Sequence, residues 1–206
     1  VCDGDWGVAE GLVFENFEVK EFDWVKKLKD KQVVAHGSDF GFTQDPTTLV
    51  STIVDTQNKE LWIYNEHYQR GMLTDEIYQM YIDKGLKNAE IIADSAEKRL
   101  ITEIKRKGIS NIKPSVKGQG SIMQGVQFIQ GFKIYVHPSC EHTIEELNTY
   151  TFDQDKDGNW LNKPIDENNH ILDALRYSLE KFHFPRNNKT NVNIKKNISR
   201  AKAMGL

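Results

Sequence analysis

The chain has 206 residues, 38% of them hydrophobic and 28% charged, a composition that allows a globular protein with a full core. Its net charge is -3, and setting aside the six basic residues of an acid-free stretch at 186–206 leaves -9 on the body. This balance excludes a surface that is basic overall, so any contact with nucleic acid has to be local. The sequence shows neither an apolar run long enough for a membrane span nor a signal peptide.

The first third of the chain predicts a leading segment followed by an antiparallel meander. Residues 1–32 mix aromatic and charged residues with little periodicity, so we expect them to pack against the body. Because the first residue is Val1 and not Met, we also expect a fragment of a longer protein. Three β-rich runs follow, separated by turns at 44–47 and 57–59, and this pattern favours antiparallel pairing. The three runs are 33–41, 48–55 and 61–67.

The rest of the chain alternates between helices and short strands. Apolar residues at helical spacing indicate the helices, and short apolar runs between them indicate buried strands. The expected helices are 74–86, 95–107, 123–129, 141–150 and 168–182. The expected strands are 90–94, 112–116 and 133–136, and a polar hairpin is expected over 153–162. This order predicts an α/β fold, in which a mixed central sheet with an antiparallel N-terminal meander carries helices on both faces.

Three acidic residues stand where such a fold can bring them together. Asp39 lies near the end of the first core strand, Asp94 ends a later strand, and Asp173 lies on the last helix. Carboxylates are hard oxygen ligands that suit Mg²⁺ or Mn²⁺. Two such ions about 4 Å apart can stabilise the attacking and the leaving oxygen of a phosphodiester displacement. The sequence therefore predicts that these three acids form one site for divalent metal ions.

Each of these acids also has a purely structural interpretation. Asp94 could cap the following helix, because residues 94–97 resemble a capping box. Asp39 could cap a turn before Gly41, and Asp173 could be a solvated residue on a surface helix. His170 lies one helical turn before Asp173, so its imidazole and the carboxylate can face the same volume.

A glycine-containing loop precedes the helix at 123–129. Lys117 and Gly118 begin this loop, whose lysine and backbone N–H groups could cradle a phosphate. We hold both residues as candidate DNA contacts. The alternative is a flexible turn between a strand and a helix, and the sequence alone leaves both interpretations open.

Four blocks of sequence together resemble a known family. They are GSDFG at 37–41 with DPT at 45–47, IIADSAE at 91–97, KG at 117–118 before SI at 121–122, and HILDALRY at 170–177. From His36 to Phe182 the chain resembles the C-terminal nuclease domain of the large terminase subunit of tailed phages, which has an RNase H-like fold. The opening, GDW at 4–6 with EG at 10–11, resembles the end of the ATPase domain that precedes this nuclease.

The resemblance implies roles for four residues and a reaction. Asp39, Asp94 and Asp173 would bind two Mg²⁺ or Mn²⁺ ions, and His170 would lie close to them. The activity implied is that of a metal-dependent endonuclease, which cuts double-stranded concatemeric DNA during genome packaging. The implied partners are double-stranded DNA, the terminase small subunit and the portal protein, and the implied location is the host cytoplasm during phage assembly.

The resemblance also implies a division of the chain into three parts. Residues 1–32 would be a linker and the end of the ATPase domain, 33–185 the nuclease domain, and 186–206 a basic flexible tail. No Walker A pattern occurs in the sequence, so we expect no ATP hydrolysis. Two alternatives stay open: another RNase H-like nuclease, of resolvase or transposase type, and a non-catalytic module that docks on DNA or on the portal.

Overall fold

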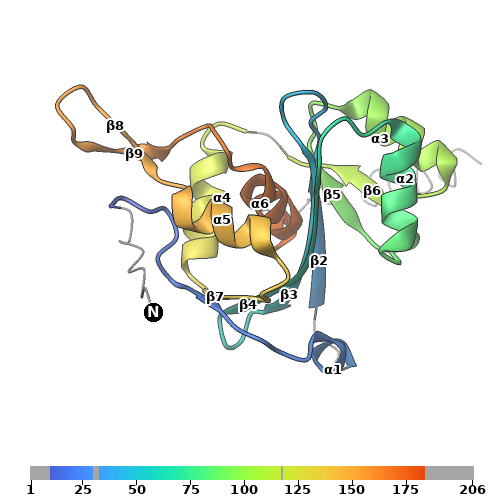
Figure 1. Ribbon diagram of the computed structural model, residues 1–206, viewed down its shortest axis with the longest axis horizontal. Helices are drawn as coiled ribbons and strands as arrows, with labels where there is room; N and C mark the ends of the chain where they lie inside the picture. Colours follow the sequence, from blue (N-terminus) through green and yellow to red (C-terminus); the bar gives the residue numbers. More distant parts are fainter. Residues whose placement is uncertain (1–9, 30–32, 117, 184–206) are drawn as a thin grey trace, which may run out of the picture.

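A mixed sheet runs through the centre of the molecule (Figure 1). The computed structural model describes residues 10–29, 33–116 and 118–183, and in them a seven-stranded sheet has the order β1-β7-β4-β3-β2-β5-β6. Its strands are β1 (Phe17–Val19), β2 (Val33–Asp39), β3 (Thr47–Asp55), β4 (Glu60–Gln69), β5 (Ile91–Ala93), β6 (Ile112–Pro114) and β7 (Lys133–Val136). Lys117, the predicted basic tail and most of the predicted end of an ATPase domain lie outside the described residues.

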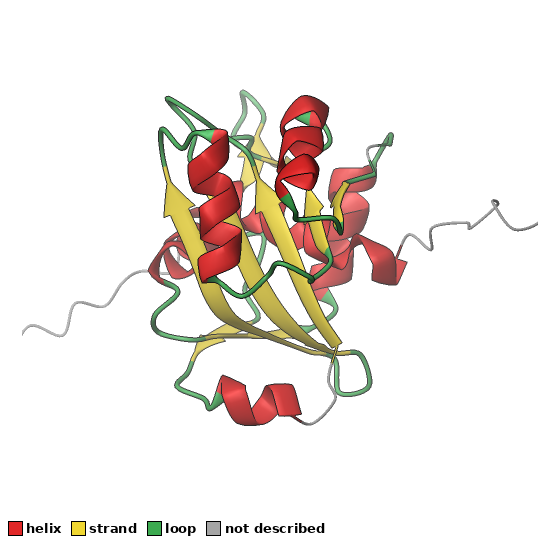
Figure 2. Ribbon diagram, turned by 90° about the vertical axis from the view of Figure 1, so that its right-hand side faces the viewer, coloured by secondary structure: helices red, strands yellow, loops and turns green. Residues whose placement is uncertain are grey.

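Six helices are present in the described part of the chain. They are α1 (Trp24–Lys29), α2 (Thr74–Asp83), α3 (Lys98–Lys107), α4 (Ser121–Gln130), α5 (Glu141–Thr149) and α6 (His170–His183). Helices α4, α5 and α6 cover one face of the sheet, and α2 and α3 cover the other, as Figures 1 and 2 show. None of the helices in these ranges is long and apolar enough to cross a membrane. The predicted α/β architecture is confirmed.

The N-terminal meander has the predicted antiparallel pairing. Strand β3 pairs antiparallel with both β2 and β4, and all of its residues but the last are buried. Alternate side chains of β3 face opposite ways, so Val50 and Val54 pack with α6 while Leu49 packs with α2 and α3. A strand covered on both faces needs apolar or small residues at every position, which is what the run at 47–54 supplies.

Three features of the fold differ from the sequence prediction or were absent from it. Strand β1 pairs parallel with β7 at the sheet edge, and α1 follows it; both are too short for a clear hydrophobic period. Helix α3 begins at Lys98, not at residue 95, because residues 94–97 form a turn in which Asp94 accepts a hydrogen bond from Ala96 N, at 3.1 Å. The capping-box interpretation of Asp94 is therefore wrong.

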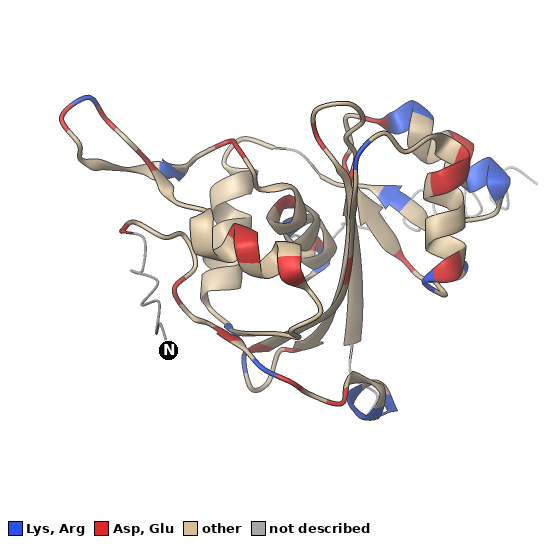
Figure 3. Cartoon of the chain, viewed as in Figure 1, with Lys and Arg blue, Asp and Glu red and all other residues tan. Residues whose placement is uncertain are grey.

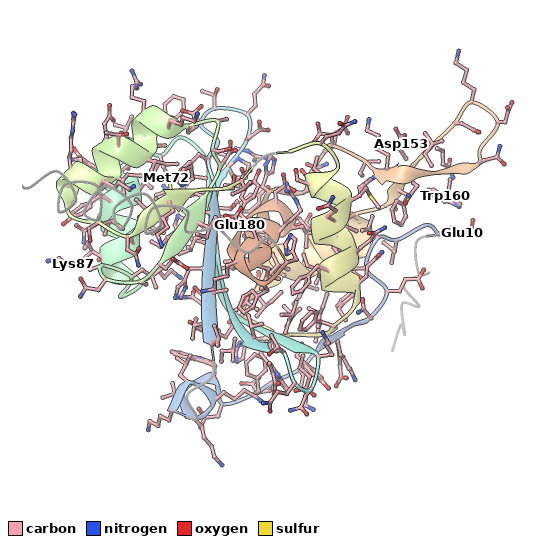
Figure 4. The ribbon with its side chains drawn as sticks, turned by 180° about the vertical axis from the view of Figure 1, so that it is seen from behind. Glu10, Met72, Lys87, Asp153, Trp160 and Glu180 are labelled. Atoms are coloured by element: carbon pink, nitrogen blue, oxygen red, sulfur yellow. The ribbon has the colours of Figure 1, made fainter. Side chains whose placement is uncertain are left out.

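The hairpin of β8 (Phe152–Gln154) and β9 (Trp160–Pro164) projects from the body beside α4 and α5 (Figure 1). Its base is tied to the leading segment, because Phe152 N donates to Gly11 O, at 2.9 Å. Trp160 packs on the backbone of Gly11, and Figure 4 shows it near Glu10. The predicted polar hairpin over 153–162 is thus confirmed, with boundaries one or two residues wider.

Helix α6 lies directly against strand β2. The closest approach is at Gly37, where an added Cβ atom would lie 1.8 Å from Ala174 O and 2.9 Å from Ser178 Cβ. Residues 174 and 178 are one helical turn apart and both small, so this face of α6 can touch the strand backbone. The absence of a side chain at position 37 therefore sets the distance between the helix and the sheet.

We expect Gly37→Ala to lower the free energy of unfolding by roughly 1–3 kcal/mol, because its methyl group has to displace the backbone of α6. Urea denaturation measures the change. Gly118→Ala is the control, since an added Cβ there meets nothing within 4 Å. A Gly37→Ala chain as stable as its parent would show that α6 can move away from β2 at little cost.

Candidate active site

The parallel pairing of β2 with β5 places two of the predicted acids side by side. In the register of this pair Ser38 lies opposite Ala93, so Asp39 and Asp94 are the next residues at the carboxyl ends of the two strands. Asp94 N donates to Ser38 O at 3.0 Å, which continues the ladder beyond the last paired residue. The carboxyl edge of a sheet is where ligands of α/β proteins commonly bind.

Helix α6 brings the third acid and the histidine to the same edge. It begins at His170, whose carbonyl oxygen accepts a hydrogen bond from Thr48 Oγ1 of β3, at 3.1 Å. Asp173 and His170 therefore face a cavity of about 540 Å³ that Asp39 and Asp94 also line. The remaining lining residues are Phe40, Asp45, Asp166, Glu167, Asn168, Asn169 and Tyr177.

His170 stands between two of the carboxylates in this cavity. Its Nδ1 lies 3.3 Å from Asp39 Oδ2, and its Nε2 lies 3.6 Å from Asp45 Oδ1. The side chain of Asp39 is mostly buried, which does not fit a residue that caps an exposed turn. The structure thus turns Asp39 towards the cavity and not towards Gly41.

The positive charge in the cavity compensates the negative charge of the Asp39 carboxylate only in part. Burial raises the pKa of Asp39, and the carboxylates of Asp173 and Asp94 raise it further. The hydrogen bond from His170 acts in the opposite direction but does not outweigh them. The pKa of His170 is raised, chiefly by this hydrogen bond to Asp39. A simple ion pair would lower the pKa of the acid, so the cavity needs more positive charge than His170 supplies.

The donor set of the cavity fits hydrated divalent cations. Among the described residues, six carboxylates line it, and none of the lining residues is Lys or Arg. Within the described ranges, no three His, Cys, Asp or Glu side chains are already arranged to hold a metal ion. Mg²⁺ does not require such a cage, because it binds through one or two carboxylates and keeps several waters. Figure 3 shows that Lys and Arg residues gather instead on α3, in the layer opposite α6.

Comparison with known proteins decides the family. Residues 39–181 match the family described as Terminase RNAseH like domain. The chain belongs to this family. It is the nuclease domain of a terminase large subunit, which makes the alternative of a resolvase or transposase core wrong.

Two curated relatives and one solved structure place this terminase domain among phage proteins. It is 33% identical over 184 residues to the PBSX phage terminase large subunit of Bacillus subtilis (strain 168), and 27% identical over 183 residues to the terminase large subunit of Bacillus phage SPP1. These matches cover 87% and 84% of the chain, which spans 42% of the length of each relative.

The crystal structure of the SPP1 large terminase nuclease domain with bound Mn superposes with a TM-score of 0.76 at 25% identity. The match covers 82% of this chain and 98% of the SPP1 domain. The predicted RNase H-like fold is confirmed.

The terminase site brings together all the predicted residues that the structure describes. Asp39, Asp94, Asp173 and His170 line one cavity, and Gly118 lines an adjoining hollow. Their roles as ligands or DNA contacts stay predictions. Asp173 is not a solvated surface residue, because its side chain is only 21% exposed.

Sequence reasoning assigned no role to two neighbours of Asp173. Arg176 Nη2 lies 2.9 Å from Asp173 Oδ1, and Tyr177 donates to Asp173 Oδ2 at 3.4 Å. The signal was available in their spacing, since residues three and four positions after Asp173 share its side of the helix. The backbone of Ala174, between these residues and Asp173, packs on Gly37.

A buried glutamate of α5 holds the start of the site helix. Glu146 is 5% exposed, and its Oε2 accepts a hydrogen bond from Leu172 N, at 3.0 Å. Its Oε1 is buried without a partner among the described residues. Burial raises the pKa of Glu146 from 4.5 to about 7, although the N–H groups of α6 favour the charged form. No local pattern around residue 146 signals this contact, since it depends on the packing of two helices.

We expect the unfolding free energy of Glu146→Gln to increase, relative to that of the parent, as pH rises. A raised folded-state pKa means that the contribution of Glu146 to stability is full below pH 4.5 and is lost through about pH 7. Glutamine stays neutral, so the difference in unfolding free energy should grow between pH 5 and pH 8 by up to about 3 kcal/mol.

Thermal denaturation in chelator across this pH range measures the difference. Glu145→Gln, at the exposed neighbouring position of α5, is the control and should show no such trend. A constant difference for Glu146→Gln would mean that this carboxyl titrates normally.

Proposed function

We propose that this terminase domain is a divalent-metal-dependent endonuclease that hydrolyses phosphodiester bonds of double-stranded DNA. The observation that carries the proposal is the cavity at the carboxyl ends of β2 and β5, where Asp39, Asp94 and Asp173 meet and no lysine or arginine of the described residues belongs to the lining. The Mn-bound nuclease domain of SPP1, which has the same fold, supports the choice of metal. In this proposal the three acids hold two Mg²⁺ or Mn²⁺ ions.

The residues of the cavity have distinct tasks in this proposal. Bound divalent ions would supply Lewis acidity towards a phosphate and compensate the carboxylate charge. Asp39 and Asp94 come from adjacent strand ends, so the sheet fixes the distance between them. The carboxylate of Asp173 contacts Arg176 and Tyr177 of the same helix, and these two contacts fix its orientation. His170 orients Asp39 through Nδ1 and presents Nε2 towards Asp45 at the cavity wall.

The wider biological role follows from the family as a further part of the proposal. The chain spans 42% of the length of its curated relatives, so it corresponds to part of a longer terminase large subunit. We propose concatemeric viral DNA as the substrate of that subunit and host cytoplasm during phage assembly as its location. The terminase small subunit and the portal protein are the partners that fit this role.

We expect Asp39→Asn, Asp94→Asn and Asp173→Asn each to abolish plasmid cleavage in Mg²⁺ or Mn²⁺, because a neutral amide is a poor metal ligand. The melting temperatures of Asp39→Asn and Asp94→Asn should be unchanged or higher, since each substitution relieves repulsion among clustered carboxylates. Asp173→Asn should also fold, but it loses the ion pair with Arg176, which offsets this gain. Gel analysis of plasmid and thermal denaturation without metal measure the two effects.

The control for these variants is Asp83→Asn, which changes the same charge at an exposed position on α2. It should cut plasmid at the parental rate. Near-parental cleavage by any one of the three cavity variants removes that residue from the metal site. If the parental chain itself binds DNA but never cuts it, the non-catalytic docking module is the correct interpretation.

We expect His170→Ala to slow cleavage without abolishing it. The imidazole contacts Asp39 and lies near Asp45, so its loss frees the Asp39 carboxylate to rotate while all three acids remain. Initial rates of plasmid nicking at saturating Mn²⁺ should fall by roughly ten- to a hundredfold, the cost of losing a partner that orients a metal ligand. A complete loss of cleavage would place His170 among the essential groups.

A further inference from the structure

A second hollow lies beside the acid cavity. Its volume is about 460 Å³, and it shares Asp166, Asp173 and Tyr177 with the cavity, so the two spaces adjoin at these residues. Its opposite wall is the start of α4, where Ser121 offers a hydroxyl and Ile122 an apolar side chain. A strand of DNA that passes through the cavity would therefore continue into this hollow.

Arg176 gives the hollow its positive charge. It is the one Lys or Arg among the described residues that line either space, and its side chain is 11% exposed. Its Nη2 and Nε lie 2.9 Å and 3.3 Å from the same oxygen of Asp173. A guanidinium group carries five N–H donors in a planar fork, so these two contacts leave donors for a second anion.

The two walls are shaped around this arginine. An added Cβ atom at Gly125 of α4 would lie 2.5 Å from Arg176 Cγ and 2.7 Å from Cδ, so α4 has no side chain where the arginine stem passes. The segment before the glycine-containing loop is tied to α6 as well. Val116 N donates to Glu180 Oε2 at 2.7 Å, and Figure 4 shows Glu180 between α6 and the sheet.

We propose that this hollow is a nucleotide subsite, in which Arg176 binds the phosphate next to the one that is cut. This inference rests on the proposed function of the acid cavity. The planar guanidinium suits two-point contact with a phosphate, and the Ser121 hydroxyl is a further donor. Ile122 offers apolar surface to the sugar and base. Asp166 and Asp173 also line the hollow, but Asp173 is paired with Arg176 and ligates a cation in the proposed reaction.

The competing role for Arg176 is to position Asp173 alone. The two roles predict different losses in Arg176→Gln. A phosphate contact predicts weaker DNA binding, a KM raised roughly tenfold with a smaller change in kcat, and a salt dependence of binding reduced by about one unit of slope. A positioning role predicts weaker Mn²⁺ binding and a lower kcat, with DNA affinity unchanged.

The experiment measures three quantities on the 206-residue chain. They are the affinity for a short DNA duplex in EDTA over a range of salt, the Mn²⁺ affinity by calorimetry, and the kinetics of plasmid cleavage. We expect Arg176→Gln to lose DNA affinity and keep Mn²⁺ affinity. Arg176→Lys should recover part of the DNA affinity, because it restores the charge without the planar fork.

A second variant tests the hollow without touching the arginine. Ile122 is 47% exposed, so Ile122→Glu adds a negative charge to the wall at little cost to folding, and we expect it to weaken DNA binding roughly tenfold. Val25→Glu is the matched control. Val25 is 45% exposed on α1, which lies at the opposite end of the sheet in Figure 1, so DNA affinity should be unaffected.

The outcomes separate this proposal from the proposed function. DNA affinity within twofold of the parent for both Ile122→Glu and Arg176→Gln overturns the subsite, even where the parental chain cuts plasmid. If Arg176→Gln does not fold, Ile122→Glu against Val25→Glu decides alone. A parental chain that cuts no DNA overturns the nuclease proposal, whereas the binding measurements in EDTA still decide whether the hollow contacts DNA.

Discussion

The contact between Gly37 and Ala174 determines the geometry of the whole site. A strand residue without a side chain lets α6 rest on the backbone of β2, with Ala174 O where a Cβ atom would otherwise be. Asp173 precedes Ala174 in the chain, and His170 lies one turn before it, so both inherit their distance from Asp39 through this contact. Any larger residue at position 37 would move the helix and the acid together. The same contact therefore determines both the packing of α6 on the sheet and the positions of the site residues.

The charge of the cavity is the second constraint, and the fold meets it only in part. Arg176 engages Asp173, and His170 engages Asp39 and lies near Asp45, but the pKa of Asp39 is still raised by its burial and by its acidic neighbours. Glu146 adds a further buried acid behind the start of α6. Uncompensated carboxylates cost stability in the absence of cations. Such a cost is a common feature of functional sites, where the arrangement serves the ligand and not the fold.

The sequence predicted much of this architecture because the main elements are locally encoded. The meander over 33–67 consists of β-rich runs divided by turn residues, and the helix that carries Asp173 shows a clear period of 3.6 residues. Strand β1 and helix α1 escaped prediction because three to six residues cannot show a period. The start of α3 was misplaced because an Asp-containing turn resembles a cap. Arg176 could have been found from its spacing, whereas Glu146 could not, because its contact joins residues 26 positions apart across two helices.

The negative charge of the chain is compatible with a DNA substrate because the site separates two kinds of contact. The three acids repel phosphate on their own and become attractive only through the cations that they hold in the proposed reaction. Arg176 lies on the far side of Asp173, so a phosphate in the second hollow meets a cation that belongs to the protein itself. In this proposal the acid cavity attracts a phosphate only through the cations that it holds, whereas the second hollow attracts one through Arg176. Arg176 can therefore hold DNA before the metal ions are bound, whereas a phosphate enters the acid cavity only together with them.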